Sequence, residues 1–147
     1  SKKMLSYQDY KQNYQNIIDT LTKYNIQVVL MSAPAVDTSY LFLRHSKSLY
    51  DEDPNLKLKK AALIVKELSK SNKLTYLNLA KHFKKKDSPS KEKSSLIINE
   101  RNFNKKDGIH PTQEGYALIA QLLYRHLKSK KLIYNYKSII CFGDSIT

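Results

Sequence analysis

The stretch YQDYKQNYQNIIDTLTKYNIQVVLMSAPAV (Tyr7–Val36) joins a helical pattern to a short apolar run, and it decides the fold class. Between Tyr7 and Tyr24, apolar residues recur every three or four positions, which predicts an amphipathic helix. The run Ile26–Met31 is almost continuously apolar, as expected of a strand covered on both faces in a parallel sheet. Ser32–Ala35 then breaks the strand and leaves a loop at its carboxyl end.

Helical patterns alternate with short apolar runs along the rest of the chain. Asp53 followed by Pro54 signals a helix start, and the apolar spacing after it predicts a helix that ends near Ser71. Its expected apolar face consists of Leu56, Leu63, Ile64 and Leu68. The further expected elements are a loop or broken helix over Thr38–Asp53, strands over Thr75–Leu79 and Lys137–Phe142, and a helix over Gln113–Lys128. The apolar face of that last helix is expected to hold Tyr116, Ile119, Ala120, Leu123 and Leu127. This alternation predicts an α/β layer fold built on a parallel sheet.

Length and composition narrow the class of protein. The 147 residues suit one domain, and 41% apolar with 27% charged residues is close to an ordinary globular protein. No run approaches the ~18 apolar residues that a membrane-spanning helix needs, so a transmembrane segment is not predicted. The single cysteine, Cys141, excludes an internal disulfide framework and a multi-thiolate zinc site. Because it lies in an apolar run, we expect it to be a small core residue.

The charge balance is strongly basic, with 26 Lys and Arg against 13 Asp and Glu and a net charge of +13. The positive electrostatic potential of such a chain favours anionic partners. Arg occurs only at positions 44, 101 and 125, so the side chain that reads phosphate and guanine is scarce and nucleic-acid binding is not favoured. The run KKKDSPSKEK (Lys84–Lys93) contains no apolar residue and predicts a mobile, solvated loop.

Two short segments contain residues suited to nucleophilic catalysis. Ser145 lies in a Gly-Asp-Ser turn that follows the predicted strand Lys137–Phe142, at the carboxyl end where α/β sheets bind ligands. Asp107 and His110 lie three residues apart on a turn that contains Gly and Pro. A serine hydroxyl needs a base, and an imidazole base needs a carboxylate to set its tautomer. The alternative is structural: Ser145 forms a turn, Asp107 forms an Asx-turn, and His110 caps the helix that starts at Gln113.

Together these segments resemble the SGNH, or GDSL-type, serine esterases and lipases. ICFGDSIT (Ile140–Thr147) resembles the nucleophile block of that family, and DGIHPTQEGYALIA (Asp107–Ala120) resembles its last block. Tyr7–Val36 is similar to the family's penultimate helix–strand unit. Among the subgroups, the isoamyl-acetate-hydrolysing esterases show the greatest similarity, which makes short-chain acetate esters the first substrate to test.

The resemblance implies a three-layer α/β/α sandwich with five parallel strands, and hydrolysis of small or medium acyl esters through an acyl-enzyme. Ser145 would be the nucleophile, His110 the general base and then acid, and Asp107 the orienting carboxylate. The Ser145 backbone N–H would be one oxyanion donor, and Gly143 and Asp144 would organise the turn. No metal and no organic cofactor is implied.

The chain departs from the family pattern in two ways. The family places the GDS block first, whereas here residues 1–132 and 133–147 of a single, partial SGNH-like domain stand in reversed order, as after a cyclic reordering. The family's glycine block and Gly-x-Asn-Asp block, which supply two further oxyanion donors, are absent. We therefore expect that these 147 residues are not the whole folding unit, and that a second polypeptide or a further segment completes the sheet.

A second class of function stays open at this point. A catalytically inactive, basic SGNH-like module could hold an anionic polymer or a membrane surface through its net charge. The retained Ser145, Asp107 and His110 favour the enzyme instead. The sequence leaves the compartment undetermined, although one unpaired Cys and abundant Lys favour the cytosol.

Overall fold

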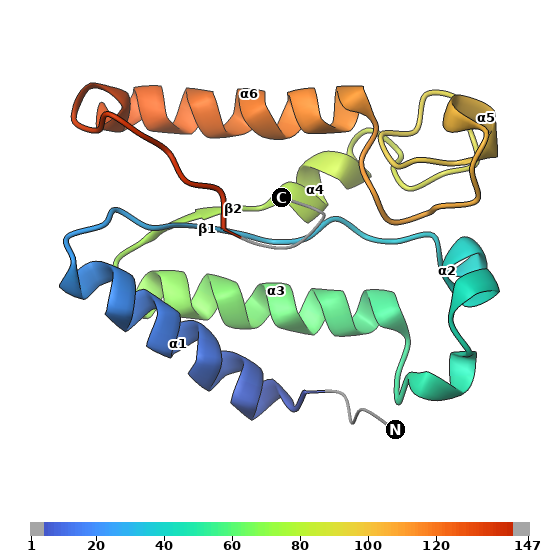
Figure 1. The fold of residues 1–147 in the computed structure, drawn as a ribbon, viewed down its shortest axis with the longest axis horizontal. Helices are drawn as coiled ribbons and strands as arrows, with labels where there is room; N and C mark the ends of the chain where they lie inside the picture. Colours follow the sequence, from blue (N-terminus) through green and yellow to red (C-terminus); the bar gives the residue numbers. More distant parts are fainter. Residues whose placement is uncertain (1–4, 143–147) are drawn as a thin grey trace. The chain divides into compact units, whose positions relative to one another are not determined.

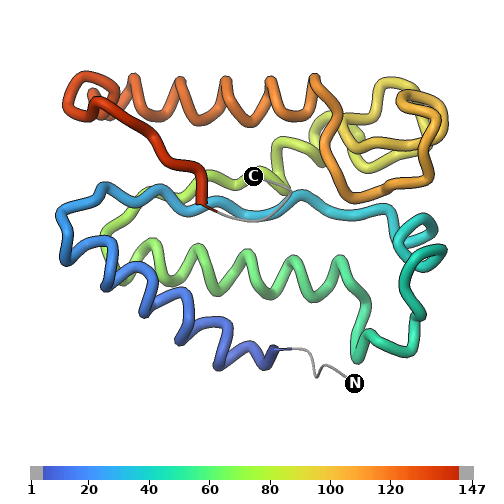
Figure 2. Tube along the Cα trace, viewed as in Figure 1, coloured from blue at the N-terminus to red at the C-terminus, as the bar shows by residue number. Residues whose placement is uncertain are grey.

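A computed structural model describes residues 5–142 (Figure 1). The chain falls into two compact units. Among the described residues, one unit holds 5–34 and 45–81 and the other holds 35–44 and 82–142, so the chain passes from one unit to the other more than once (Figure 2).

The first unit contains a two-stranded parallel sheet with helices against it. Strand β1 (Val29–Met31) pairs with β2 (Thr75–Leu77), so that Val29 lies opposite Thr75. Helices α1 (Tyr7–Lys23) and α3 (Pro54–Ser71) pack against each other, and α3 contacts both strands (Figure 1). The remaining elements of this unit are η1 (Lys47–Leu49) and the first turn of α4 (Leu79–Lys84). The predicted α/β class with a parallel sheet is confirmed, and two strands occur among the described residues.

Local capping explains where the two long helices begin and end. The Ser6 side chain accepts a hydrogen bond from the Asp9 N–H at 3.1 Å, and this caps α1. Asp53 caps α3 in the same way, with Pro54 as the first helical residue. Just beyond each helix, Asn25 and Lys73 adopt the left-handed conformation, with φ of 57° and 55°. Both helices therefore match their predicted bounds within a residue.

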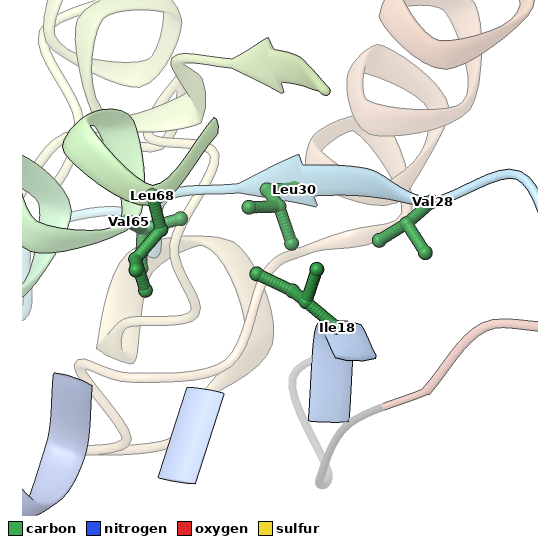
Figure 3. Packing of buried hydrophobic residues seen from close by; sticks show 5 residues of the cluster. All are labelled: Ile18, Val28, Leu30, Val65 and Leu68. Carbon is green, nitrogen blue, oxygen red and sulfur yellow. The ribbon is translucent and has the colours of Figure 1, made fainter. Parts of the chain in front are cut away.

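The core of the first unit lies between the sheet and the two helices. Figure 3 shows its central residues, which are Ile18, Val28, Leu30, Val65 and Leu68. The predicted apolar face of α3 is partly wrong, because Leu56 and Leu63 are 44% and 58% exposed. At 100° per residue, both positions lie almost opposite Val65 on the helix. The side of α3 that contains Val65 is the one that packs against β1, although the opposite side of the helix also contains leucines.

The second unit is built around helix α6 (Gln113–Ser129), which confirms the helix predicted over Gln113–Lys128. The other elements are α2 (Thr38–Arg44), α5 (Glu100–Phe103), η2 (Leu132–Tyr134) and the end of α4. The Thr112 side chain caps α6 by accepting a hydrogen bond from the Gly115 N–H at 3.2 Å. Of the predicted apolar face of this helix, Leu127 is buried, whereas Tyr116 is 39% exposed.

The Lys84–Lys93 segment is less solvated than its composition indicates. Ser88 is only 5% exposed, and its hydroxyl accepts a hydrogen bond from the Leu96 N–H at 2.7 Å. The buried Asn99 amide donates to the carbonyls of Ser90 and Glu92, both at 2.9 Å. Short polar side chains thus make hydrogen bonds to backbone groups that water would otherwise make, while the lysines of the segment are exposed.

The strand predicted over Lys137–Phe142 is not formed. This segment has no strand partner among the described residues, and Ile140 and Phe142 are 84% and 80% exposed. Cys141 is exposed as well, so its expected place in the core is wrong. A strand is stable only when a neighbour satisfies its backbone N–H and C=O groups, and apolar sequence alone cannot supply that neighbour.

Candidate active site

The turn Asp107–Thr112 takes its shape from hydrogen bonds within itself. The Asp107 Oδ1 atom accepts from the backbone N–H groups of Ile109 and His110, at 2.9 and 2.7 Å. Gly108 adopts the left-handed conformation, with φ of 73°. Asp107 therefore forms the Asx-turn that the structural alternative predicted, and the same contacts hold its carboxylate in place.

The His110 ring lies against this carboxylate. Its Nδ1 atom is 2.9 Å from Asp107 Oδ2 and 3.0 Å from Oδ1. A carboxylate only accepts hydrogen bonds, so in the neutral ring we assign the proton to Nδ1 and the lone pair to Nε2. The His110 side chain is 33% exposed, whereas the Asp107 side chain is 13% exposed. His110 does not cap α6, because Thr112 occupies that position.

The protonation of Asp107 suits the role of a hydrogen-bond acceptor. Burial raises the pKa of the Asp107 carboxyl, but hydrogen bonds from the His110 backbone and ring and from the Ile109 backbone outweigh burial. The pKa of Asp107 is therefore lowered from its ordinary value, and the group is a carboxylate at neutral pH.

A neighbouring extended segment holds one side of the turn. Ile97 and Pro111 form an antiparallel bridge, and the Ile98 N–H donates to the His110 carbonyl at 2.9 Å. The Gly108 N–H donates in turn to the Ile98 carbonyl, also at 2.9 Å. Because these bonds involve the backbone of both Gly108 and His110, they fix the path of the chain through the turn.

Helix α2 holds the other side of the turn. The Asp37 N–H donates to the Gly108 carbonyl at 2.8 Å. A Cβ atom on Gly108 would lie 2.9 Å from both the Asp37 carbonyl oxygen and the Tyr40 Cβ, so no larger residue fits there. At the other end of α2, the Arg44 guanidinium donates to the Asp107 carbonyl, and its Nη1 lies 3.5 Å from Asp107 Oδ2.

Sequence reasoning did not find this contribution of α2. The residues Thr38–Arg44 show no clear helical period, and nothing in the sequence indicates that Arg44 reaches Asp107 across more than sixty positions. The one available signal was Asp37 two residues before Ser39, a capping pattern in which Asp37 Oδ1 accepts from the Ser39 N–H at 3.0 Å.

The structure brings together two of the three predicted catalytic residues. Ser145, with Gly143 and Asp144, lies outside the described residues, so its distance from His110 remains a matter of prediction. Within residues 5–142, no group of three His, Cys, Asp or Glu side chains is arranged to hold a metal ion. No helix in the same range combines the length and the apolar character needed to cross a membrane.

A hydrogen-bonded His–Asp pair on an α/β fold is typical of hydrolases that activate a serine. The sequence profile of the GDSL-like lipase/acylhydrolase family matches residues 3–123, which include this pair and end before the GDSIT motif. The chain belongs to that family. The match does not identify the isoamyl-acetate subgroup.

Comparison with solved structures supports the same fold. The chain is similar to the crystal structure of a GDSL-like lipase from Bacteroides thetaiotaomicron, with a TM-score of 0.54 and 18% sequence identity. The similarity covers 82% of this chain and 51% of the other, so the chain spans about half the length of that lipase. A search of curated protein sequences gave no significant match.

Proposed function

We propose that this protein is a serine hydrolase that cleaves small or medium carboxylic esters. Ser145 is the nucleophile, His110 the general base and acid, and Asp107 the residue that orients the imidazole. The contact of 2.9 Å between His110 Nδ1 and Asp107 Oδ2 carries the proposal, because it leaves Nε2 as the basic atom. Membership of a lipase/acylhydrolase family supports the reaction class.

The chemistry follows from the roles of these groups. The Ser145 Oγ attacks the ester carbonyl carbon while its proton moves to His110 Nε2, and Asp107 stabilises the imidazolium that forms. The tetrahedral intermediate collapses when its C–O bond breaks and the imidazolium protonates the departing alcohol. In the second half, His110 Nε2 takes a proton from water as its oxygen attacks the acyl carbon; the bond from that carbon to Ser145 Oγ then breaks, and the imidazolium returns the proton to Oγ, which releases the acid.

Stabilisation of the oxyanion requires donors beyond the Ser145 backbone N–H. Removing one such donor costs about 10²–10³ in turnover, so a fully active site needs more than these residues supply. We propose that a further segment or a second polypeptide provides the missing donors and completes the sheet. Two observations support this proposal: the chain spans about half of the similar lipase, and it contains no Gly-x-Asn-Asp motif.

Covalent capture of the nucleophile tests the proposal without requiring turnover. The protein is purified together with any polypeptide that binds it and is treated with a fluorophosphonate, and the intact mass of this chain is measured before and after. We expect one adduct in the wild type and in Ser94→Ala, a control at an exposed serine, and no adduct in Ser145→Ala. An adduct that persists in Ser145→Ala would remove that residue from its role.

The His–Asp pair is tested by the rate of the same reaction. We expect His110→Gln and Asp107→Asn to slow the capture, because each removes one member of the pair that activates the hydroxyl. Absence of any adduct in the wild type, together with salt-sensitive binding to an anionic polymer, would instead identify an inactive basic binding module.

A further inference from the structure

We propose that Arg44, the last residue of α2, is a positioning residue that holds the Asp107 carboxylate in line with the His110 ring. The proposal rests on the function proposed above, because it assigns Arg44 to the same His–Asp pair. The observations are the two contacts that Arg44 makes with Asp107, the anchoring of α2, and the position of Asp107 Oδ2 between Arg44 and His110.

The two oxygens of Asp107 are held in different ways. Oδ1 accepts from the backbone N–H groups of Ile109 and His110, which belong to the turn itself. Oδ2 has no such backbone donor among the described contacts; it faces His110 Nδ1 at 2.9 Å and Arg44 Nη1 at 3.5 Å. Both oxygens turn together about one torsion, so His110 and Arg44 act from the Oδ2 side on a carboxylate that the turn already holds at Oδ1.

Arg44 makes two contacts with the same residue. One N–H group donates to the Asp107 backbone carbonyl, and the other side of the guanidinium faces the carboxylate. The guanidinium is planar and carries donors in a fixed fork, so a contact at the backbone sets the direction of the contact at the side chain. A lysine could satisfy one of the two acceptors at a time.

Helix α2 is anchored at its other end as well. The Asp37 N–H donates to the Gly108 carbonyl at 2.8 Å, and Asp37 Oδ1 accepts from the Ser39 N–H at the start of the helix. Lys91 Nζ lies 2.8 Å from Asp37 Oδ2 and 3.0 Å from the centre of the Tyr40 ring. The first residues of α2 are therefore bound to the turn at Gly108, and its last residue, Arg44, is bound to the turn at Asp107.

The expected effect is modest because the contact is partly solvated. The Arg44 side chain is 40% exposed, and ion pairs of this kind change an equilibrium by about twofold to fivefold. Loss of Arg44 should thus shift the balance between the Nδ1–H and Nε2–H forms of neutral His110 by that factor. A purely structural role would change stability and leave this balance unaltered.

The test is ¹⁵N NMR of the His110 ring in the full chain at alkaline pH, where the Nδ1 and Nε2 shifts report the tautomer ratio. We expect Arg44→Gln to lower the ratio of the Nδ1–H form to the Nε2–H form by about twofold to fivefold, and Arg44→Lys to lie between it and the wild type. Arg101→Gln is the matched control, since Arg101 forms an exposed ion pair with Glu92 at 2.8 Å. It should leave the ratio unchanged.

Asp107→Asn separates failure of this proposal from failure of the proposed function. If Asp107→Asn shifts the ratio and Arg44→Gln does not, Arg44 is no positioning residue, while the His–Asp pair stands. If Asp107→Asn also leaves the ratio unchanged, the pair itself is refuted and both proposals fail. An Arg44→Lys ratio equal to that of the wild type would likewise overturn the argument that one guanidinium must hold both acceptors of Asp107. Because the lysine variant retains the charge, it also covers the case in which Arg44→Gln does not fold.

Discussion

Gly115 lies in the first turn of α6, where replacement by Ala has two opposite effects on the free energy of unfolding: helix propensity raises it and packing lowers it. In an exposed helix, replacing Gly with Ala stabilises a protein by roughly 0.5–1 kcal/mol. Gly115 is buried, however, and a Cβ there would lie 2.5 Å from the Leu96 carbonyl oxygen and 2.9 Å from the Pro111 Cβ. Both distances are well inside van der Waals contact, so the helix or the facing segment has to move by about 1 Å.

The facing carbonyl cannot move without loss. The Leu96 oxygen accepts a hydrogen bond from the Thr112 N–H at 2.8 Å, beside the bridge between Ile97 and Pro111. Forcing an extra methyl group into a packed site costs about 1–3 kcal/mol, and a weakened hydrogen bond adds about 0.5–1.5 kcal/mol. Set against the gain in propensity, Gly115→Ala should lower the free energy of unfolding by roughly 0.5–4 kcal/mol, centred near 2 kcal/mol.

Chemical denaturation followed by circular dichroism measures this change. For a chain of this length, a loss of about 2 kcal/mol corresponds to a Tm lower by roughly 4–8 °C. The control is Gln121→Ala, an exposed position of the same helix, which should stay within about 0.5 kcal/mol of the wild type. A Gly115→Ala variant as stable as the wild type, or more stable, would refute the argument that α6 is packed directly on the Leu96 backbone.

Two further predictions concern the turn Asp107–Thr112, and a third concerns Asp37 at the start of α2. Gly108→Ala should destabilise the protein by about 1–3 kcal/mol in urea unfolding, because Gly108 has φ of 73° and a Cβ would lie 2.9 Å from the Asp37 carbonyl oxygen. The pKa of Asp107 is lower in the folded state than in the unfolded state, so its stabilising contribution is present above the unfolded pKa and is lost as the pH falls through the folded pKa. Below about pH 4 the free energy of unfolding of the wild type should therefore fall more steeply than that of Asp107→Asn. Parallel plots of the free energy of unfolding against pH would contradict this. Lys91→Met should raise the pKa of Asp37, whose ion pair with Lys91 helps to lower it, and carboxyl NMR titration would show an unchanged value if the pair contributes nothing.

The local parts of the site could be predicted from the sequence. The bounds of α1, α3 and α6 follow from apolar spacing and caps, which depend on residues within a few positions. The contact between Asp107 and His110 is local as well, because three residues on a Gly-containing turn keep both side chains on one side. The residues that specify these interactions therefore lie close together in the sequence, where a local pattern can show them.

The remaining features depended on contacts between distant segments. Which side of α3 is buried, the failure of Lys137–Phe142 to form a strand, and the approach of Arg44 to Asp107 each depend on a partner far away in the sequence. A strand needs the backbone of a neighbour, and a guanidinium finds its carboxylate only after the chain has folded back. Local pattern determined the elements and the His–Asp pair of this protein; tertiary structure decided which faces are covered and what holds the pair in place, because pairing and burial are properties of neighbours in space.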